Sequence, residues 1–284
     1  MTTQRRGFVF FKRTTAVVLA LLLLFSAASA QPYEGLRVLL IGVDARSADQ
    51  PGRSDAMMLA QISPSGEVRL ASFLRDLYVS IPGHGKNRLN AAYFYGGEDL
   101  LKQTFEKNFG ITVDRTVTVD FSVLSDLVDE LGGVQVDITQ AELAYLNQLL
   151  KDHGRETMAD AGLQRLDGFQ ALCYSRLRKL DGDFQRTSRQ HTLIAAMLQQ
   201  MAQLDRWTLL KLAVKNISRV QTDLSLGDLT QLAPLIAKLD EAVIRTAHVP
   251  FEGAFSEETV NGMMVLSPDL KRCRARLEAF LTEE

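Results

Sequence analysis

The sequence predicts an α/β fold built around a central mixed β-sheet in one domain, an α/β/α sandwich. The segment "LRVLLIGV" (36–43) is an almost continuous apolar run, typical of a strand that is buried on both faces. Two strand-like runs, 56–62 and 67–74, flank a Ser-Pro-Ser-Gly turn, which indicates an antiparallel hairpin. Further along the chain, segments with helical spacing alternate with β-rich segments, as expected when helices cover a sheet.

This alternation continues to the C-terminus. Further strands are expected at 115–121, 134–138 and 242–249. Helices are expected at 96–110, 122–133, 184–204, 207–220, 228–239 and 267–281, with Ser122, Asp183 and Ser267 at N-terminal ends. The segment 139–167 is weakly patterned and is expected to be helical in part. The domain is expected to run from 33 to 284.

Composition limits the classes of protein that this chain fits. Its 284 residues, of which 46% are hydrophobic, are enough to bury a sizeable core. The net charge of −2 gives no sign of nucleic-acid binding, so no nucleic-acid partner is expected. Two cysteines, Cys173 and Cys273, leave two alternatives open, a disulfide or two buried thiols.

Residues 1–30 have the features of an export segment. Positive residues precede an apolar run that begins at Ala16, and the run ends in the Ala-x-Ala pattern of Ala28 to Ala30. The apolar core is shorter than the roughly 20 residues that span a membrane, which slightly favours a cleaved signal peptide over an uncleaved N-terminal anchor. Both alternatives place the remaining chain outside the cytoplasm.

An Arg and an Asp stand together near the ends of the first three expected strands. The pairs are Arg46 with Asp44, Arg53 with Asp55, and Arg75 with Asp76. A local ion pair would explain each one, but ligands of open α/β sheets bind at strand ends, so the repetition indicates one site. Carboxylates together with arginine forks fit a phosphorylated ligand that is held with Mg²⁺. No zinc-ligand spacing, P-loop or G-x-S-x-G motif is present.

The stretch 174–191 concentrates further arginines. A helix that starts after Asp183 would place Arg186, Arg189 and Gln190 on one face near its N-terminus, where the helix dipole favours an anion. Arg176 and Arg178 would face the same way if 174–178 were extended. The alternative is a network of these arginines with Asp181 and Asp183. We consider anion binding the better explanation.

A set of ordered motifs resembles the LytR–CpsA–Psr family of cell-wall glycopolymer ligases. The runs are "LLIGVDAR", "GRSDAMML", "LRDLYVSIPG", "RLNAAYFYGG", "VDFSVLSDLVDELGGVQVDI", "LDGFQALCYSRLR", "GDFQRTSRQ" and "NGMMVLSPD". The resemblance implies an α/β sandwich with an apolar tunnel for a lipid tail. It also implies an extracytoplasmic phosphotransferase, secreted or anchored, that works at the membrane lipid surface. Such an enzyme moves a glycopolymer from a polyprenyl-pyrophosphate carrier to peptidoglycan through a phosphodiester.

The resemblance also implies roles for the residues singled out above. Asp44 and Asp55 are expected to bind Mg²⁺ (or Mn²⁺), and Asp183 to take a proton from the acceptor, with Arg75 as the second catalytic residue. The expected pyrophosphate-binding residues are Arg53, Arg75, Arg176, Arg178, Arg186 and Gln190, to which the helix-face argument adds Arg189. Leu193, Ile194, Met197 and Leu198 are candidates for the tunnel wall, although ordinary core packing explains such a stripe equally well or better.

The chain departs from the family pattern at a few positions, and other functions compete with transfer. Leu74 replaces a usual proline, Arg88 a usual lysine and His191 a common glutamine, and none of these changes removes a charged group from the expected site. The alternatives are a protein that binds polyprenyl pyrophosphates without transfer and a pyrophosphatase that uses water as acceptor. A transcription regulator is disfavoured by the export segment and by the lack of a basic helix-turn-helix pattern.

Overall fold

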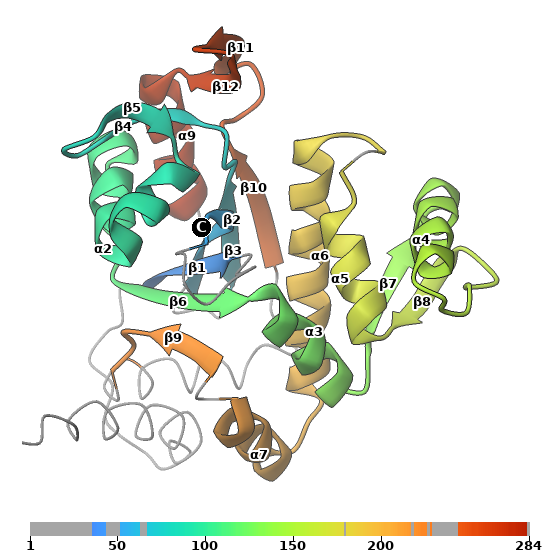
Figure 1. The fold of residues 1–284 in the computed structure, drawn as a ribbon. Helices are drawn as coiled ribbons and strands as arrows, with labels where there is room; N and C mark the ends of the chain where they lie inside the picture. Colours follow the sequence, from blue (N-terminus) through green and yellow to red (C-terminus); the bar gives the residue numbers. More distant parts are fainter. Residues whose placement is uncertain are drawn as a thin grey trace, which may run out of the picture.

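Six strands form the central sheet in the computed structural model of the chain (Figure 1). They are β1 (Arg37–Val43), β2 (Ser54–Ile62), β3 (Val68–Phe73), β6 (Arg115–Asp120), β9 (Val220–Thr222) and β10 (Ile244–Val249). Their order across the sheet is β10-β3-β2-β1-β6-β9. β1 pairs in parallel with β6 and antiparallel with β2, so the predicted mixed sheet is confirmed. The structure describes residues 36–43, 52–62, 67–178, 180–216, 219–225, 228 and 244–282.

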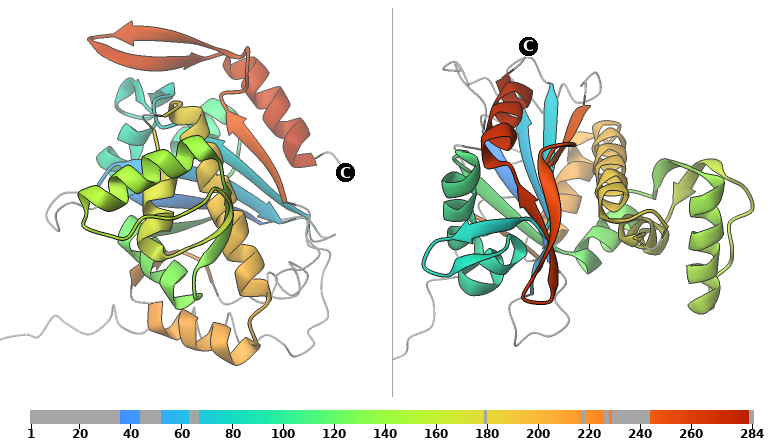
Figure 2. Two further views of the ribbon diagram at one scale, coloured as in Figure 1. Left: turned by 90° about the vertical axis from the view of Figure 1, so that its right-hand side faces the viewer. Right: turned by 90° about the horizontal axis from the view of Figure 1, so that it is seen from above.

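Helices cover both faces of this sheet (Figures 1 and 2). Those in contact with it include α2 (Asn90–Phe109), α6 (Asp183–Ala202) and α9 (Leu270–Thr282). α2 and α9 share one face, where Leu39 and Ile41 of β1 pack in one cluster with Phe105. α6 lies on the other face, where Leu40 and Ile194 belong to a second cluster. Because alternate residues of a strand face opposite sides, the apolar run of β1 serves both layers.

A smaller α/β group packs against the outer side of α6. It consists of α3 (Phe121–Glu130), β7 (Val134–Ile138), α4 (Gln140–Asp152), β8 (Gly162–Leu166) and α5 (Gly168–Arg176). Its core cluster is continuous with Leu193 of α6. Gly168 allows α3 and α5 to approach closely, since a Cβ there would lie 2.0 Å from the carbonyl oxygen of Ser125. Because α4 lies within it, the segment 139–167 is helical in part, as predicted.

Two hairpins that the sequence analysis did not predict lie beside each other at one end of the sheet. They are β4 (Tyr78–Ile81) with β5 (Gly85–Arg88), and β11 (Phe255–Val260) with β12 (Met263–Pro268). Leu266 N donates to the carbonyl oxygen of Asp76 at 2.9 Å, and Arg88 Nε donates to that of Met264 at 3.1 Å. These bonds fix both hairpins above the edge of the sheet where the site lies (Figure 1).

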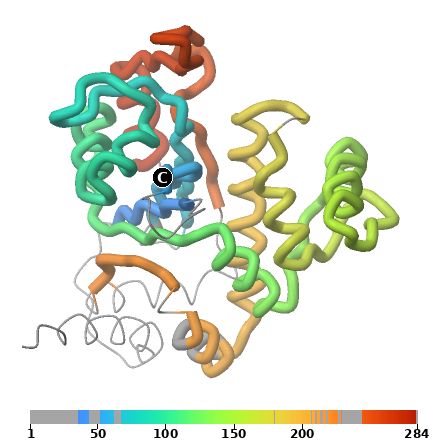
Figure 3. Tube along the Cα trace, viewed as in Figure 1, coloured from blue at the N-terminus to red at the C-terminus, as the bar shows by residue number. Residues whose placement is uncertain are grey.

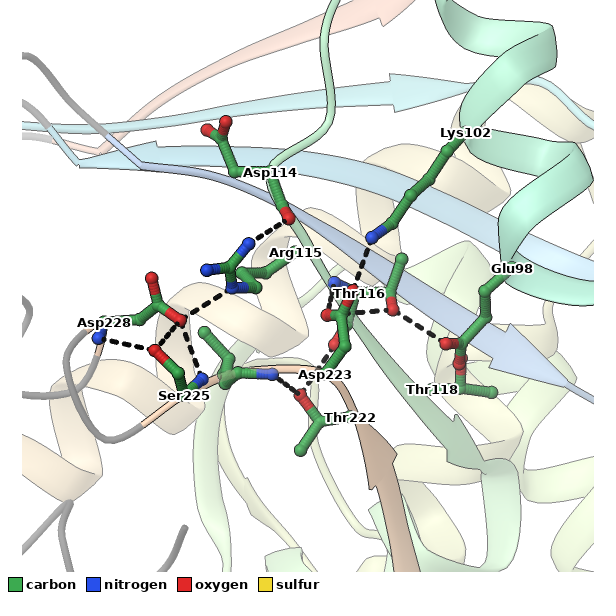
Figure 4. A network of polar contacts seen from close by, with 11 residues as sticks. Glu98, Lys102, Asp114, Arg115, Thr116, Thr118, Thr222, Asp223, Ser225 and Asp228 are labelled. Atoms are coloured by element: carbon green, nitrogen blue, oxygen red, sulfur yellow. Dashed lines mark hydrogen bonds and ion pairs between the residues drawn. The ribbon is translucent and has the colours of Figure 1, made fainter.

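A polar network joins β6, β9 and α2 (Figure 4). The hydroxyls of Thr116 and Thr118 donate to Glu98 of α2 at 2.8 and 2.6 Å. Asp223, next to β9, accepts from Thr116 N at 2.6 Å and pairs with Lys102. Because each carboxylate in this network has its own donors, we assign it a structural role.

Several boundaries differ from the predictions. α3 begins at Phe121 and is capped by Asp120, whose Oδ1 accepts from Ser122 N at 2.7 Å. Gly182 is the N-cap of α6, so Asp183 is its first residue. The C-terminal helix starts at Leu270, because β12 extends to Pro268, and α9 packs beside α2 (Figure 3).

The remaining differences concern α5, α7 and the cysteines. The condition that 174–178 be extended, under which Arg176 and Arg178 would face the same way, is not met, since α5 continues to Arg176. α7 (Arg206–Asn216) stops earlier than predicted, and β9 takes up the end of that segment. The expected helix 228–239 falls outside the described residues except for Asp228. Cys173 and Cys273 are free and buried, in different core clusters, so the thiol alternative holds.

Candidate active site

Four charged side chains meet at one end of the central strands and form what we call the charge cluster. They are Asp55, Arg75, Asp183 and Arg186. Asp55 is the second residue of β2, and Arg75 follows the end of β3. Because β2 and β3 are antiparallel, the start of β2 lies beside the end of β3. α6 begins at Asp183, and its first turn supplies Arg186. The structure thus brings together four of the predicted site residues.

Direct contacts connect the members of the charge cluster. Arg75 Nη1 donates to Asp55 Oδ1 at 2.5 Å. Arg186 Nη2 donates to Asp183 Oδ2 at 3.1 Å and to the carbonyl oxygen of Asp55 at 3.4 Å. The last bond ties the first turn of α6 to β2. Arg75 and Arg186 are therefore both bound to Asp55, one through its side chain and the other through its backbone.

Three atoms of the charge cluster are buried without a hydrogen-bond partner among the described residues: Arg75 Nε, Arg186 Nε and Asp183 Oδ1. A buried polar atom that lacks a partner costs about 1–3 kcal/mol, and more when the group is charged. Such atoms are rare in folded proteins, and a cluster of them indicates a place where a polar ligand supplies the missing bonds. Two guanidinium donors and one carboxylate acceptor fit a ligand with anionic oxygens and a hydroxyl.

Burial and charge shape the protonation of the two arginines. Burial lowers the pKa of Arg186, and the nearby positive charges of Arg75 and Arg178 add to this while Asp183 opposes it. Burial also acts to lower the pKa of Arg75, but the hydrogen bond to Asp55 and the charges of Asp55 and Asp183 outweigh it, and the pKa is raised. Both guanidinium groups stay charged at neutral pH, and an anion between them would offset their repulsion.

Three more predicted arginines are exposed, and one of them, Arg178, lies next to the charge cluster. Arg178 Nε lies 3.8 Å from Asp183 Oδ1. The guanidinium carbon of Arg53 lies 5.9 Å from the ring centroid of Phe94, and that of Arg176 lies 4.9 Å from the ring centroid of Phe121. Arg176 is the last residue of α5, and Arg178 lies two residues beyond it, before α6 begins at Asp183.

Arg189 is held away from the charge cluster by its own partners. Its Nε donates to Glu142 at 2.6 Å, its Nη1 donates to Asp181 at 2.9 Å and to the carbonyl oxygen of Leu177 at 3.0 Å, and its Nη2 pairs with Asp181. For this residue the alternative of an Arg–Asp network describes what the structure contains. Its predicted role in pyrophosphate binding stays a prediction without geometric support.

Gln190 lines an apolar pocket between α6 and the sheet. The pocket encloses about 540 Å³ of empty space, part of it open to solvent. Its lining residues are Leu40, Ile41, Gly42, Ala56, Met58, Val119, Phe121, Leu124, Ser175, Gln190, Leu193 and Ile194. Leu193 and Ile194 of the α6 stripe line the pocket and also belong to core clusters, whereas Met197 and Leu198 belong to core clusters and are not among the lining residues. The pocket occupies the place that the expected lipid tunnel would take.

Asp55 is the one expected metal ligand that the structure describes. Its side chain is 27% exposed, and its Oδ1 is bound by Arg75. Asp44 lies outside the described residues, one position beyond the end of β1. Within the described ranges, no group of three or more His, Cys, Asp or Glu side chains could hold a metal ion. Mg²⁺ needs only one or two carboxylates when phosphate oxygens and water complete its shell, so the donor type fits this cation.

Comparison with known proteins assigns the chain to a family. The sequence model of the LytR_cpsA_psr family matches residues 22–279. The chain belongs to the LytR_cpsA_psr family. Within it, the polyisoprenyl-teichoic acid–peptidoglycan teichoic acid transferase TagT of Bacillus subtilis is 34% identical over 213 residues, which cover 72% of this chain and 65% of TagT. The match therefore spans just under two thirds of TagT's own length.

A second relative and a solved structure of TagT extend the comparison. The transferase TagU of Oceanobacillus iheyensis is 32% identical over 267 residues, covering 88% of this chain and 78% of TagU. The solved structure of YwtF (TagT) with bound octaprenyl pyrophosphate lipid is 28% identical, covers 90% of this chain and 94% of its own, and has a TM-score of 0.67. In the described part of the present chain, no helix is long and apolar enough to cross a membrane, and the expected leader 1–30 falls outside that part.

Two histidines that the sequence analysis did not connect, the buried His191 and the half-buried His248, form a stacked pair next to the site in this LytR_cpsA_psr protein. His191 Nε2 lies 2.6 Å from Ser72 Oγ of β3, and the His191 ring stacks on that of His248 with centroids 4.9 Å apart. His248 Nε2 lies 3.1 Å from Ser188 Oγ. Burial lowers the pKa of both rings, that of His191 to about 3 with a further contribution from His248. Neutral rings thus fasten α6 to β3 and β10.

We expect this pair to make folding pH-dependent. Above pH 6.5 His191 is neutral in both the folded and unfolded states, and its contribution to stability is complete. As the pH falls from about 6.5 toward 3, His191 is protonated in the unfolded chain but stays neutral in the folded protein. The free energy of unfolding therefore decreases by up to about 1.4 kcal/mol per pH unit. Urea unfolding at pH 7.5, 5.5 and 4.5 should show a flatter profile for His191→Gln than for the natural protein. The exposed His153→Gln serves as control, and equal slopes in all three proteins would contradict the prediction.

Proposed function

We propose that the chain is a phosphotransferase that moves a glycopolymer, such as a teichoic acid or a capsular polysaccharide, from a polyprenyl-pyrophosphate carrier to peptidoglycan. The observation that carries this proposal is the set of three buried atoms that lack a hydrogen-bond partner among the described residues, Arg75 Nε, Arg186 Nε and Asp183 Oδ1. Arg186 lies about one turn of α6 from Gln190 of the apolar pocket. Support also comes from relatives that are named teichoic acid transferases and from a relative crystallised with octaprenyl pyrophosphate.

The donor would lie across the charge cluster and the pocket. The polyprenyl tail suits the apolar pocket under α6, because burying each CH₂ group contributes about 0.8 kcal/mol. Its pyrophosphate would then receive hydrogen bonds from Arg75 and Arg186, while the exposed Arg53, Arg176 and Arg178 approach from the rim. Guanidinium groups bind phosphate oxygens in pairs, which positions the anion as well as neutralising it.

The proposed reaction is an in-line displacement at the phosphorus that carries the glycan. A peptidoglycan hydroxyl attacks this phosphorus, and the bond to the bridging oxygen of the pyrophosphate breaks. The polyprenyl monophosphate leaves, and one phosphate then links the glycan to the acceptor. Charge that develops on the transferred group and the leaving oxygen is stabilised by Arg75 and Arg186, which are already positioned and largely screened from water.

Asp183 is the group proposed to take the proton of the acceptor. It is the first residue of α6, whereas Leu193 and Ile194 of the pocket lie about ten residues further on, or roughly 15 Å along the helix axis. The carboxylate therefore lies at the end of α6 that is away from Leu193 and Ile194. Arg186 binds its Oδ2 and leaves Oδ1 without a hydrogen-bond partner among the described residues, as a base that accepts a proton from an entering hydroxyl requires.

A divalent cation, Mg²⁺ or Mn²⁺, is proposed to assist, held by Asp55 together with Asp44. When bound, it would neutralise phosphate oxygens and so favour attack by the hydroxyl. Treatment with EDTA is expected to abolish transfer, and added Mg²⁺ or Mn²⁺ should restore it. Asp55→Asn should need a higher cation concentration for half-maximal rate than the natural protein, because one of two charged ligands is lost. Full activity in EDTA would refute the metal proposal and leave the transfer proposal intact.

The reaction would take place outside the cytoplasm, at the cell envelope, where peptidoglycan is located and where the carrier's lipid lies in the membrane surface. This location follows from the substrates and agrees with the export segment expected at 1–30.

The transfer assay uses the full-length chain in detergent with Mg²⁺, a polyprenyl-pyrophosphate disaccharide and soluble peptidoglycan oligomers. Mass spectrometry should detect a disaccharide joined to the oligomer through phosphate. Lipid that is bound but not consumed would support a binding protein instead, and phosphorylated disaccharide free in solution would support a pyrophosphatase. The exposed Arg155→Ala, far from the charge cluster, provides the matched control.

A further inference from the structure

Three aromatic rings form an exposed group next to the charge cluster, and we call Phe94, Tyr95 and His84 the aromatic platform. Phe94 and Tyr95, near the start of α2, are 40% and 41% exposed. The His84 ring, from the turn between β4 and β5, lies parallel to the Tyr95 ring, with 7° between the planes and 4.6 Å between the centroids. The Phe94 and Tyr95 rings meet edge to face at 5.8 Å. The result is an aromatic surface that stays open to solvent.

The backbone around the aromatic platform holds these rings in place. Gly96 and Gly97 interrupt α2 directly after Tyr95, and the φ of +62° and ψ of −150° at Gly97 suit glycine alone. Asn87 Nδ2 donates to Tyr95 Oη at 2.9 Å, which fixes the outer ring. Burying a large apolar side chain stabilises the fold by about 1.5–3 kcal/mol, and rings that stay exposed contribute less than this. An arrangement of this kind indicates a binding surface.

Arg53 connects the aromatic platform to the charge cluster. Its guanidinium carbon lies 5.9 Å from the centroid of the Phe94 ring, within the range of a cation–π contact. In the chain, Arg53 is two residues before Asp55, which binds Arg75. The platform is carried by α2 and the β4–β5 turn, whereas the apolar pocket lies under α6 on the opposite face of the sheet (Figure 1). The charge cluster therefore lies between the two.

The chemistry of the aromatic platform fits the ring of a sugar. An aromatic face carries partial negative charge and attracts the C–H groups on one face of a pyranose. The hydroxyls on the edge of the same pyranose need hydrogen-bonding groups, which Asn87 and Arg53 provide beside the rings. A lipid tail would instead need an enclosed apolar cavity.

In-line geometry decides which saccharide binds there. In phosphoryl transfer the attacking and leaving oxygens lie on opposite sides of the phosphorus. If the lipid phosphate leaves toward the pocket under α6, the acceptor hydroxyl enters from the side of α2. Resting on the proposed function, we infer that the aromatic platform binds a pyranose ring of the peptidoglycan glycan strand and so positions the acceptor for attack.

The test measures the KM for each substrate separately in the full-length protein. Tyr95→Ala should raise the KM for the peptidoglycan oligomer about threefold to tenfold, the value of one stacking contact, and leave the KM for the lipid donor unchanged. Tyr95→Phe keeps the ring and should stay close to the natural protein. Trp207→Ala removes an exposed aromatic residue on α7 and should change neither KM. His84→Ala provides a second variant, on a different element, with the same expected direction.

Calorimetric titration with soluble peptidoglycan glycan-strand oligosaccharides separates this inference from the proposed function, since binding needs no turnover. Weaker binding by Tyr95→Ala than by Tyr95→Phe supports the inference even if no transfer takes place. An unchanged acceptor KM in Tyr95→Ala and His84→Ala would overturn it. A rise in the donor KM alone would also overturn it, because the platform would then hold the glycan of the donor.

Discussion

Replacing Arg186 with alanine is expected to lower kcat/KM for glycan transfer by about 10²–10³-fold, which is the loss observed when one preorganised donor to a developing anion is removed. Arg186 is the more buried of the two arginines in the charge cluster, and it also fixes Asp183 Oδ2 and the backbone of Asp55. Its removal takes away a phosphate ligand and leaves a carboxylate without its main partner. Steady-state assays with lipid donor and peptidoglycan oligomer measure the effect.

Arg186→Lys is the matched variant for this prediction. Lysine keeps the charge but lacks the planar fork, so it should recover only part of the lost rate. If Arg186→Ala retained the full rate while folding normally, the charge cluster would not be the site of phosphate stabilisation.

Asp183→Asn is expected to lower kcat by about 10²–10⁴-fold with little change in the KM for the donor, because the loss of a general base acts on the chemical step. Asparagine has nearly the same shape, so the first turn of α6 should remain intact. The measurement is single-turnover transfer at saturating donor and acceptor.

Asp181, two residues before Asp183, provides a control for Asp183→Asn. Asp181→Asn changes an acid that binds Arg189 and does not contact the charge cluster, so kcat should fall far less. Equal losses in both variants would contradict the role of Asp183 as base and would indicate a structural effect on α6.

Much of the frame could be predicted from the sequence because it follows from local patterns. The continuous apolar run of β1 and the turn between β2 and β3 fixed three neighbouring strands. Because antiparallel pairing places the start of β2 at the end of β3, the positions of Asp55 and Arg75 in the sequence were enough to predict that they would meet.

Other features depended on contacts between distant segments. Arg189 seemed to share the site with Arg186, but Glu142, which lies 47 residues away, binds it in the core. The helical course of α5 did have a local signal, since Asp167 and Gln170 form a capping box, and this signal was overlooked. β5 has only four residues and β11 is mostly exposed, so neither strand shows an alternating pattern.

The measurement that tests the central claim most directly is the mass of the lipid released during transfer. Attack on the phosphorus that carries the glycan predicts a polyprenyl monophosphate as the lipid product and a glycan linked to peptidoglycan through a single phosphate. Release of the polyprenyl pyrophosphate, with the glycan joined directly to the acceptor, would show that the bond to the sugar breaks instead. That result would contradict phosphoryl transfer at the charge cluster of Arg75, Asp183 and Arg186.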